Sequence, residues 1–178
     1  MRVLIAALAC VLSATLAGAP AAAQETRARV GLPGYKDSFP IEDVTAAFEL
    51  SAPMARSHEA IKEAFAGLGI PLDRDEPSGL VVGAQNLSAR ITFAGYRMAK
   101  VFDCGSNTMG QNADSFRVTI VFLALLDPVS PTKTRLRIGV IGGGEPVGGS
   151  RSHAVQCAST GVLEARLVEL ANKQLGAP

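Results

Sequence analysis

The segment from residue 116 to residue 141 constrains the fold most, because it reads as two long antiparallel β-strands. A turn-forming stretch at 127–131 separates two stretches in which apolar residues alternate with other residues. The first strand is also apolar on its second face towards its end, at Val121, Leu123 and Leu125. A strand that is apolar on both faces has to be covered on both. Ile141 on the second strand adds to the same apolar excess, and we expect the last helix of the chain to provide the cover.

Two other segments have the spacing of amphipathic helices. The first is predicted over residues 53–67, and Gly67 and Gly69 supply its end. The second carries Leu163, Leu167, Leu170 and Leu175 on roughly one side. It has Glu164 in its first turn and Lys173 in its last, as the helix dipole favours.

Shorter strands complete the predicted order of elements. Alternation predicts a strand over 44–50, and turn-forming residues predict a hairpin over 70–85. Residues 87–103 fit either a strand or a helix, and we expect a short strand followed by a loop that carries Cys104. The order β-α-β-β-β-β-β-α predicts an α+β fold, with an antiparallel sheet and two helices packed on one face. Residues 44–178 are enough for a single domain with its own core.

This order resembles that of a known family of bacterial envelope domains. A helix is followed by Leu68-Gly69-Ile70, a turn with Asp75, Gly79-Leu80-Val81, a long hairpin and a closing helix. The succession is similar to the helix-grip domains of the outer-membrane assembly lipoprotein C family. The resemblance covers residues 44–175 as element order and implies a small accessory domain of the cell envelope.

Residues 1–23 have the pattern of a secretory signal peptide. Arg2 precedes an apolar run over 3–12, and small residues at 21–23 form a cleavage site. The run is too short to span a bilayer, so we expect an exported bacterial protein, periplasmic or secreted, without a transmembrane span. Cys10 offers the alternative of lipidation, but it lies inside the apolar run and not at its end. Residues 24–43 lack periodicity and are rich in glycine and proline, which predicts a flexible leader.

Export changes the interpretation of the two cysteines that remain. In an oxidising compartment Cys104 and Cys157 have one possible pairing, a disulfide. His153 and Cys157 have the spacing of metal ligands on a helix, but a disulfide removes the thiolate that such a site needs. We therefore expect neither a metal nor a cofactor.

The charge balance excludes one class of partner. Without Arg2 the chain has equal numbers of basic and acidic residues. Its densest basic cluster is Lys133, Arg135 and Arg137, spaced along one face of a strand. Nucleic-acid binding requires a basic surface that neutralises phosphates, and no such surface is evident.

Two sets of residues support functional hypotheses. The glycine-rich stretch 142–150 predicts a flexible loop, and a weaker hypothesis lets this loop close over a ligand. The binding residues would then be Gly143, Gly144, Gly148, Gly149 and Arg151. A hydrolase would have to use Ser152, His153 and Asp103.

The leading hypothesis is therefore a non-catalytic exported domain that binds an envelope protein, a peptide or a lipid. Its site would be an apolar groove between the sheet and the last helix. A small periplasmic hydrolase and a structural subunit of an envelope complex are the alternatives.

Overall fold

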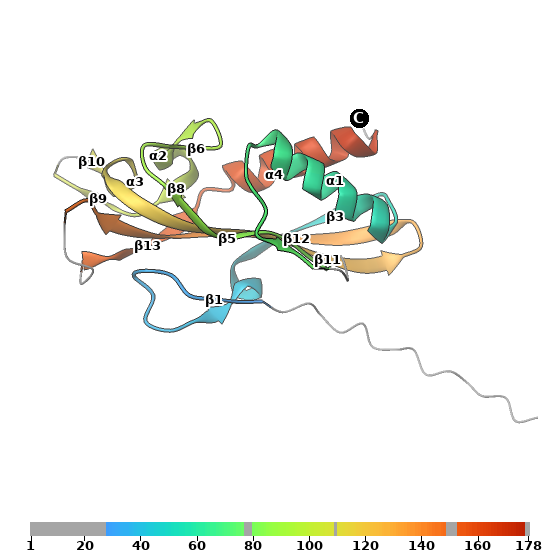
Figure 1. Ribbon diagram of the computed structural model, residues 1–178, viewed down its shortest axis with the longest axis horizontal. Coiled ribbons are helices and arrows are strands. Elements are labelled where there is room, and N and C mark those ends of the chain that lie inside the picture. Colours follow the sequence, from blue (N-terminus) through green and yellow to red (C-terminus); the bar gives the residue numbers. More distant parts are fainter. Residues whose placement is uncertain (1–27, 77–79, 109, 149–152, 177–178) are drawn as a thin grey trace, which may run out of the picture.

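The computed structural model describes residues 28–76, 80–108, 110–148 and 153–176, and within them it has the expected α+β architecture. A twisted antiparallel sheet forms the middle layer, with helices on one side and the N-terminal segment on the other (Figure 1). The sheet strands are β3 (Thr45–Leu50), β4 (Arg74–Asp75), β5 (Val81–Ala89), β8 (Phe102–Asp103), β11 (Phe116–Ser130), β12 (Lys133–Pro146) and β13 (Val155–Ser159). The long helices are α1 (Met54–Gly67) and α4 (Val162–Leu175).

The long hairpin β11–β12 is the axis of the sheet, as the sequence predicts. Its register runs from Phe116 opposite Pro146 to Ser130 opposite Lys133. The outer edge of β12 is shared by two strands in succession. β3 pairs with Thr134 to Gly139, and β13 pairs with Ile141 to Gly144.

Helices α1 and α4 pack against each other and on one face of the sheet, which confirms the predicted arrangement. The centre of this core is a ring contact between Phe65 of α1 and Phe122 of β11, with ring centroids 4.8 Å apart. Ile61, Leu163 and Leu167 are fully buried around it. Burying one such side chain stabilises the fold by about 1.5–3 kcal/mol, so this core holds both helices in place.

The second face of the sheet is covered by the N-terminal segment, and this corrects two expectations. Residues 28–43, here called the strap, were expected to be part of a flexible leader, and the last helix was expected to cover the second face. The strap instead forms β1 (Arg29–Val30), β2 (Phe39–Pro40) and most of the 3-10 turn η1 (Ile41–Val44). Four strap residues are buried against the sheet, and the cluster comprises Ala28, Val30, Leu32, Ile41, Val81, Val121, Leu123, Leu125 and Ile141.

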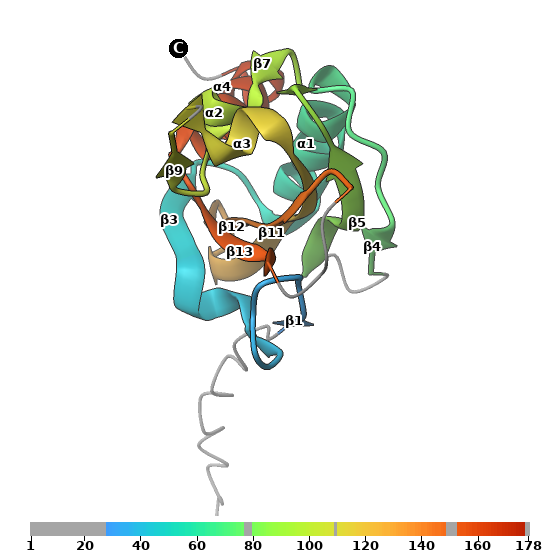
Figure 2. The same ribbon diagram turned by 90° about the vertical axis from the view of Figure 1, so that its left-hand side faces the viewer.

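Residues 90–115 form a small irregular unit on the helix side, where Figure 2 shows it beside α4. Its elements are β6 (Thr92–Phe93), β7 (Tyr96–Arg97), α2 (Met98–Val101), β9 (Ser106–Asn107), β10 (Gly110–Gln111) and α3 (Asn112–Ser115). The predicted loop in this region is therefore replaced partly by short hairpins and helical turns.

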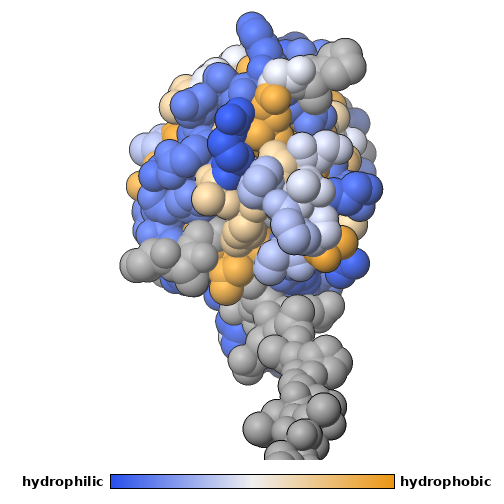
Figure 3. Space-filling view, turned by 90° about the vertical axis from the view of Figure 1, so that its right-hand side faces the viewer, coloured by the Kyte–Doolittle hydropathy of each residue, from blue (hydrophilic) through white to orange (hydrophobic). Residues whose placement is uncertain are grey.

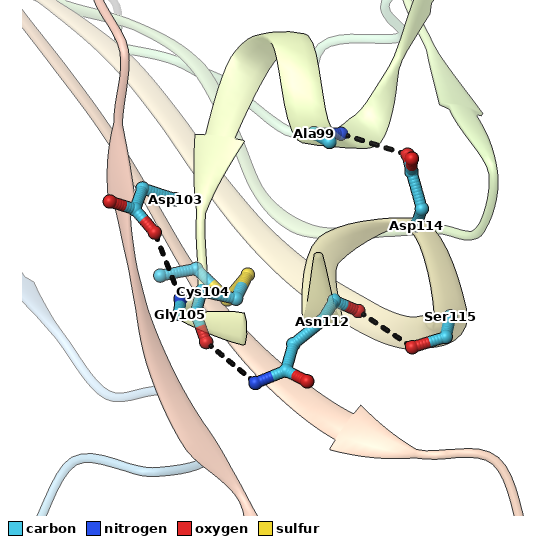
Figure 4. Close-up of a disulfide and its surroundings, with 8 residues drawn as sticks. Ala99, Asp103, Cys104, Gly105, Asn112, Asp114 and Ser115 are labelled. Atoms are coloured by element: carbon cyan, nitrogen blue, oxygen red, sulfur yellow. Dashed lines mark hydrogen bonds between the residues drawn. A yellow bond between two sulfur atoms is a disulfide. The ribbon is translucent and has the colours of Figure 1, made fainter. Parts of the chain in front are cut away.

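The predicted disulfide joins this unit to the sheet. Cys104 and Cys157 are bonded and buried, and they lie 53 residues apart in sequence. The turn that carries Cys104 is held on both sides. The Asp103 carboxylate accepts a hydrogen bond from the Gly105 amide at 2.9 Å, and the Asn112 side chain donates to the Cys104 carbonyl at 3.1 Å (Figure 4).

The glycine-rich stretch also differs from its prediction, because β12 continues to Pro146 and residues 142–146 are strand, not loop. A Cβ atom on Gly143 would lie 2.2 Å from the Pro33 carbonyl oxygen of the strap. A Cβ atom on Gly144 would lie 3.1 Å from the Cys157 sulfur on the other face. Glycine is needed at these two positions because the strap packs closely on one face of the strand and Cys157 on the other.

Candidate binding crevice

A crevice opens at the outer edge of β12, between the stretch that pairs with β3 and the stretch that pairs with β13. Thr45 is the first β3 residue on β12, opposite Gly139, and Ala158 of β13 lies opposite Ile141. Val140 lies between these two pairs. The cavity at this junction has a volume of about 590 Å³. Ligand pockets in proteins commonly span about 300–1,000 Å³, so the crevice has the size of a small-molecule site.

All three layers of the molecule contribute to the walls. The strap side contributes Tyr35, with Val44 following at the end of η1, and the beginning of α4 contributes Glu164. The remaining lining residues belong to the sheet and to the turn before α4, namely Thr45, Ala46, Val140, Ile141, Gln156, Ala158, Ser159, Thr160 and Gly161. Among the lining residues that the structure describes, Glu164 is the only one with a charged side chain.

The polar wall is fixed by the start of α4. Gly161 is the residue before the helix, so the helix begins without a side-chain cap. Ser159 replaces this cap: its hydroxyl accepts a hydrogen bond from the Gly161 amide at 3.1 Å and donates one to Glu164 Oε2 at 2.9 Å. Glu164 is 6% exposed and lies in the first turn, where the helix dipole favours a carboxylate. The carboxylate is thus held in one orientation beside the cavity.

Tyr35 provides an aromatic wall that stays neutral. Its ring packs against Phe39 with centroids 5.0 Å apart. Burial raises the pKa of Tyr35 to about 12, from an ordinary value of 10.0. The phenol therefore remains protonated throughout the physiological range and adds no second charge to the crevice.

The residues of the predicted ligand loop that the structure describes, Gly143, Gly144 and Gly148, do not line this crevice. Gly143 and Gly144 lie inside β12, where neighbouring atoms fill the space beside them. Gly148 lies in a turn with a φ of 77° and nothing within 4 Å of the position of a Cβ atom. Gly149 and Arg151 lie outside the described residues, so the structure does not test their proposed role.

The set considered for a hydrolase is described only in part. Asp103 holds the turn that carries Cys104 through its contact with the Gly105 amide. His153 is exposed just before β13, and Ser152 lies outside the described residues. Cys157 is bonded to Cys104, which removes its thiolate from the ligands a metal could use. Within the described ranges, no group of three His, Cys, Asp or Glu side chains is placed to hold a metal ion.

Most of the residues predicted to line a groove between the sheet and the last helix lie elsewhere. Val121, Leu123 and Leu125 are buried under the strap and not beside α4. Of the four residues behind that prediction, Ile141 alone lines the crevice. Sequence reasoning missed the crevice because it arises where two strands share one edge of β12, and alternation along a strand does not reveal its neighbours.

Comparisons of the chain with protein-family models, with curated proteins and with solved structures gave no match. In the part of the chain that the structure describes, no helix is long and apolar enough to cross a membrane. The features of this protein that bear on its function are therefore the chemistry of the crevice and the sequence itself.

Proposed function

We propose that this protein is a non-catalytic binding protein that acts outside the cytoplasm and holds a small, mainly apolar ligand in the edge crevice. The observation that carries the proposal is the lining of the crevice. Val44, Val140 and Ile141 supply apolar walls, and Glu164 with Ser159 supplies one oriented polar end. Mostly apolar walls with a few fixed polar groups are typical of ligand sites.

The proposed location has two independent supports. The first is the signal-like pattern of residues 1–23. The second is the buried Cys104–Cys157 disulfide, because disulfides persist mainly in oxidising compartments. Both fit a periplasmic or secreted protein, and neither depends on the crevice.

Two neighbouring alanines allow a matched test of the crevice. Ala46 and Ala47 are consecutive exposed residues of β3, but Ala46 lines the crevice and Ala47 does not. We expect Ala46→Trp to fill the crevice and to reduce binding of the fluorescent apolar probe N-phenylnaphthylamine by about tenfold or more, the loss expected when about 1.4 kcal/mol of contact is removed. Ala47→Trp should bind the probe like the unsubstituted protein.

The natural ligand is sought in the same comparison. The protein is purified from its own cells, extracted with organic solvent, and the extract is analysed by mass spectrometry. A small molecule that is present with the unsubstituted protein and with Ala47→Trp, but absent with Ala46→Trp, supports the proposal. Equal probe binding by both variants, or an extract without any small molecule in all three samples, contradicts it.

A further inference from the structure

The polar end of the crevice carries a single carboxylate, and one of its two oxygens is unused. Glu164 is 6% exposed, and its Oε2 accepts the hydrogen bond from the Ser159 hydroxyl at 2.9 Å. Its other oxygen, Oε1, has no hydrogen-bond partner among the described residues. That oxygen is also not closed off from solvent, in contrast to the unpaired Oε2 of Glu42. Because Glu164 lines the crevice, Oε1 is an acceptor that a bound ligand can reach.

No cationic side chain accompanies this carboxylate among the described lining residues. Lys36 and Asp43 are the charged residues directly next to lining residues in the sequence, and their charges cancel. Arg166, two residues after Glu164, lies 2.6 Å from the carboxylate of Glu169. The start of a helix attracts an anion, and Glu164 already supplies that anion. A negatively charged group on a ligand would therefore meet a like charge without a compensating cation.

The hydroxyl groups of the lining donate their protons inside the protein. Thr45 donates to a backbone carbonyl of η1 at 3.0 Å, and Thr160 donates to a backbone carbonyl of α2 at 2.7 Å. The Ser159 proton is used by the carboxylate itself. A hydroxyl whose proton is already donated presents only its lone pairs to a ligand. Gln156 and Tyr35 can still donate, but neither is charged, so the wall beside α4 consists mainly of acceptors.

We propose, on the basis of the function proposed above, that the ligand of the crevice is an amphiphilic amine. Its ammonium group binds Glu164 Oε1, and its apolar part lies against Val44, Val140 and Ile141. An ammonium has three donors and no acceptor, which suits a wall of acceptors, and its hydrogen bonds to a carboxylate are about twice as strong as neutral ones. A ligand without a donor would cover Oε1 and leave a buried carboxylate oxygen unpaired, which is costly.

Three ligands that share one decyl chain separate the effect of the polar group from that of the apolar part. Decylamine, decanol and decanoate each compete with bound N-phenylnaphthylamine at pH 7, below the concentration at which they aggregate. We expect decylamine to displace half of the probe at a concentration about tenfold lower than decanol does, because a hydrogen bond to a charged group is stronger than a neutral one. Decanoate should be the weakest of the three, because its carboxylate meets that of Glu164.

The decisive variant is Glu164→Gln, because it removes the charge and keeps an oxygen that can accept the Ser159 hydrogen bond. We expect decylamine and decanol to displace the probe from this variant at similar concentrations. Glu169→Gln is the matched control, since it makes the same substitution on the same helix at an exposed carboxylate that does not line the crevice. This control should keep the preference for decylamine. If Glu164→Gln does not fold, the order of the three ligands on the unsubstituted protein decides the question alone.

Adsorption of a decyl chain elsewhere on the surface would give a different result. Val129 is 48% exposed near the β11–β12 turn, at the end of the molecule where Figure 3 shows a narrow apolar band between hydrophilic surfaces. A chain held there lies away from Glu164, so its binding would not change in Glu164→Gln. The variant therefore separates binding in the crevice from adsorption on this band.

The outcomes distinguish this inference from the proposed function. A preference for decylamine that is present in the unsubstituted protein and in Glu169→Gln, and lost in Glu164→Gln, supports the inference. Equal displacement by decylamine and decanol, stronger displacement by decanoate, or a preference that is unchanged in Glu164→Gln overturns it and leaves the proposed function standing. If the probe does not bind, or if Ala46→Trp binds it as well as the unsubstituted protein does, the proposed function fails and this inference fails with it.

Discussion

Asp75 connects helix α1 to the edge strand β4 through two basic side chains. Its Oδ1 lies 2.8 Å from His58 Nε2, and its Oδ2 lies 3.0 Å from Lys62 Nζ. The hydrogen bond from Lys62 is the main reason why the pKa of Asp75 is lowered, and the same contact raises the pKa of Lys62. The Lys62 and Asp75 side chains are 33% and 38% exposed, so water screens their contact and its contribution to stability is modest and sensitive to salt.

This contact predicts a pH dependence of stability. Because the folded pKa of Asp75 lies below its ordinary value of 3.8, the contribution is present above pH 3.8 and is lost as the pH falls through the folded pKa. Lys62 loses its contribution only as the pH rises above its ordinary pKa of 10.5 and through its raised folded pKa. We expect Asp75→Asn to lower the free energy of unfolding at neutral pH, and the difference from the unsubstituted protein to disappear in acid.

Urea unfolding at a series of pH values measures this difference, with Asp37→Asn as the control. Asp37 is exposed on the strap, so its substitution should leave the stability unchanged at each pH. A stability difference for Asp75→Asn that persists below the folded pKa would show that the carboxylate acts through something other than its charge.

For single residues, the sequence could predict the element on which each lies but not the side chain that it contacts. The apolar spacing of residues 53–67 places His58 on helix α1, and the composition of residues 73–79 indicates a turn. The pairing of His58 with Asp75 depends on the position of the short strand β4, which lies on β5 at the sheet edge beside α1, and no local pattern encodes that position. The positive φ of Ile91 is similar, because it follows from hydrogen bonds at the base of the hairpin over residues 90–97.

At the scale of elements, the strap is a separate layer whose attachment depends on close contact with β12. Gly143 lies under Pro33, and Gly139 lies under Ile41, where a Cβ atom would be 2.5 Å from the Ile41 side chain. The two ends of the strap are also bonded to each other, because the Ala28 amide donates to Glu42 Oε1 at 2.9 Å and the Ile41 amide donates to the Ala28 carbonyl at 2.8 Å.

We predict that Gly143→Ala separates the strap from the sheet. The added methyl group would meet backbone atoms of Pro33, which cannot move without shifting the strap, and overpacking of this kind costs about 1–3 kcal/mol. Gly31→Ala is the matched control inside the strap, because its Cβ atom would have ordinary contact with Ser38 at 3.8 Å. Limited proteolysis with trypsin measures the effect at Arg29, which should be cleaved faster in Gly143→Ala alone.

Cleavage at Arg29 that is equally slow in both variants would contradict the role assigned to Gly143. Equally fast cleavage in both would mean that access to Arg29 does not depend on the contact between Gly143 and Pro33, which would also contradict this role.

The sequence predicts best those elements in which apolar residues recur at regular helical or strand spacing. Helices α1 and α4 and the hairpin β11–β12 carry enough apolar residues to define a face. The strap does not, because its four buried residues are spread among glycines and prolines. The apolar second face of β11 did predict that a cover must exist. It could not identify the cover, because a sheet face accepts a helix and an irregular segment equally well.

At the scale of the molecule, one sheet separates two cores, and a disulfide joins the sheet to the unit over residues 90–115. The larger core lies under the helices and contains both cysteines, and the smaller lies under the strap. The crevice lies where the layers meet at the sheet edge, so its shape depends on the strap and on α4 together.

We predict that loss of the disulfide destabilises the whole domain. Closing a loop of 53 residues contributes about 4 kcal/mol in the chain-entropy model. The protein treated with a reductant, and the double variant Cys104→Ala with Cys157→Ala, should both unfold at clearly lower urea concentration. The double variant should not respond to reductant. An unfolding midpoint that is unchanged by reductant, once free thiols have been measured in the sample, would contradict the structural role of the bond.

The central proposal is that the edge crevice binds a ligand, and an NMR titration of the backbone amides with N-phenylnaphthylamine tests it most directly. We expect saturable shifts that are concentrated at Ala46, Val140, Ala158 and Gly161, with little change near Val129. The same titration of Ala46→Trp should lose these shifts, whereas that of Ala47→Trp should keep them. Shifts that are absent, that do not saturate, or that are centred away from the junction of β3 and β13 would contradict the proposal.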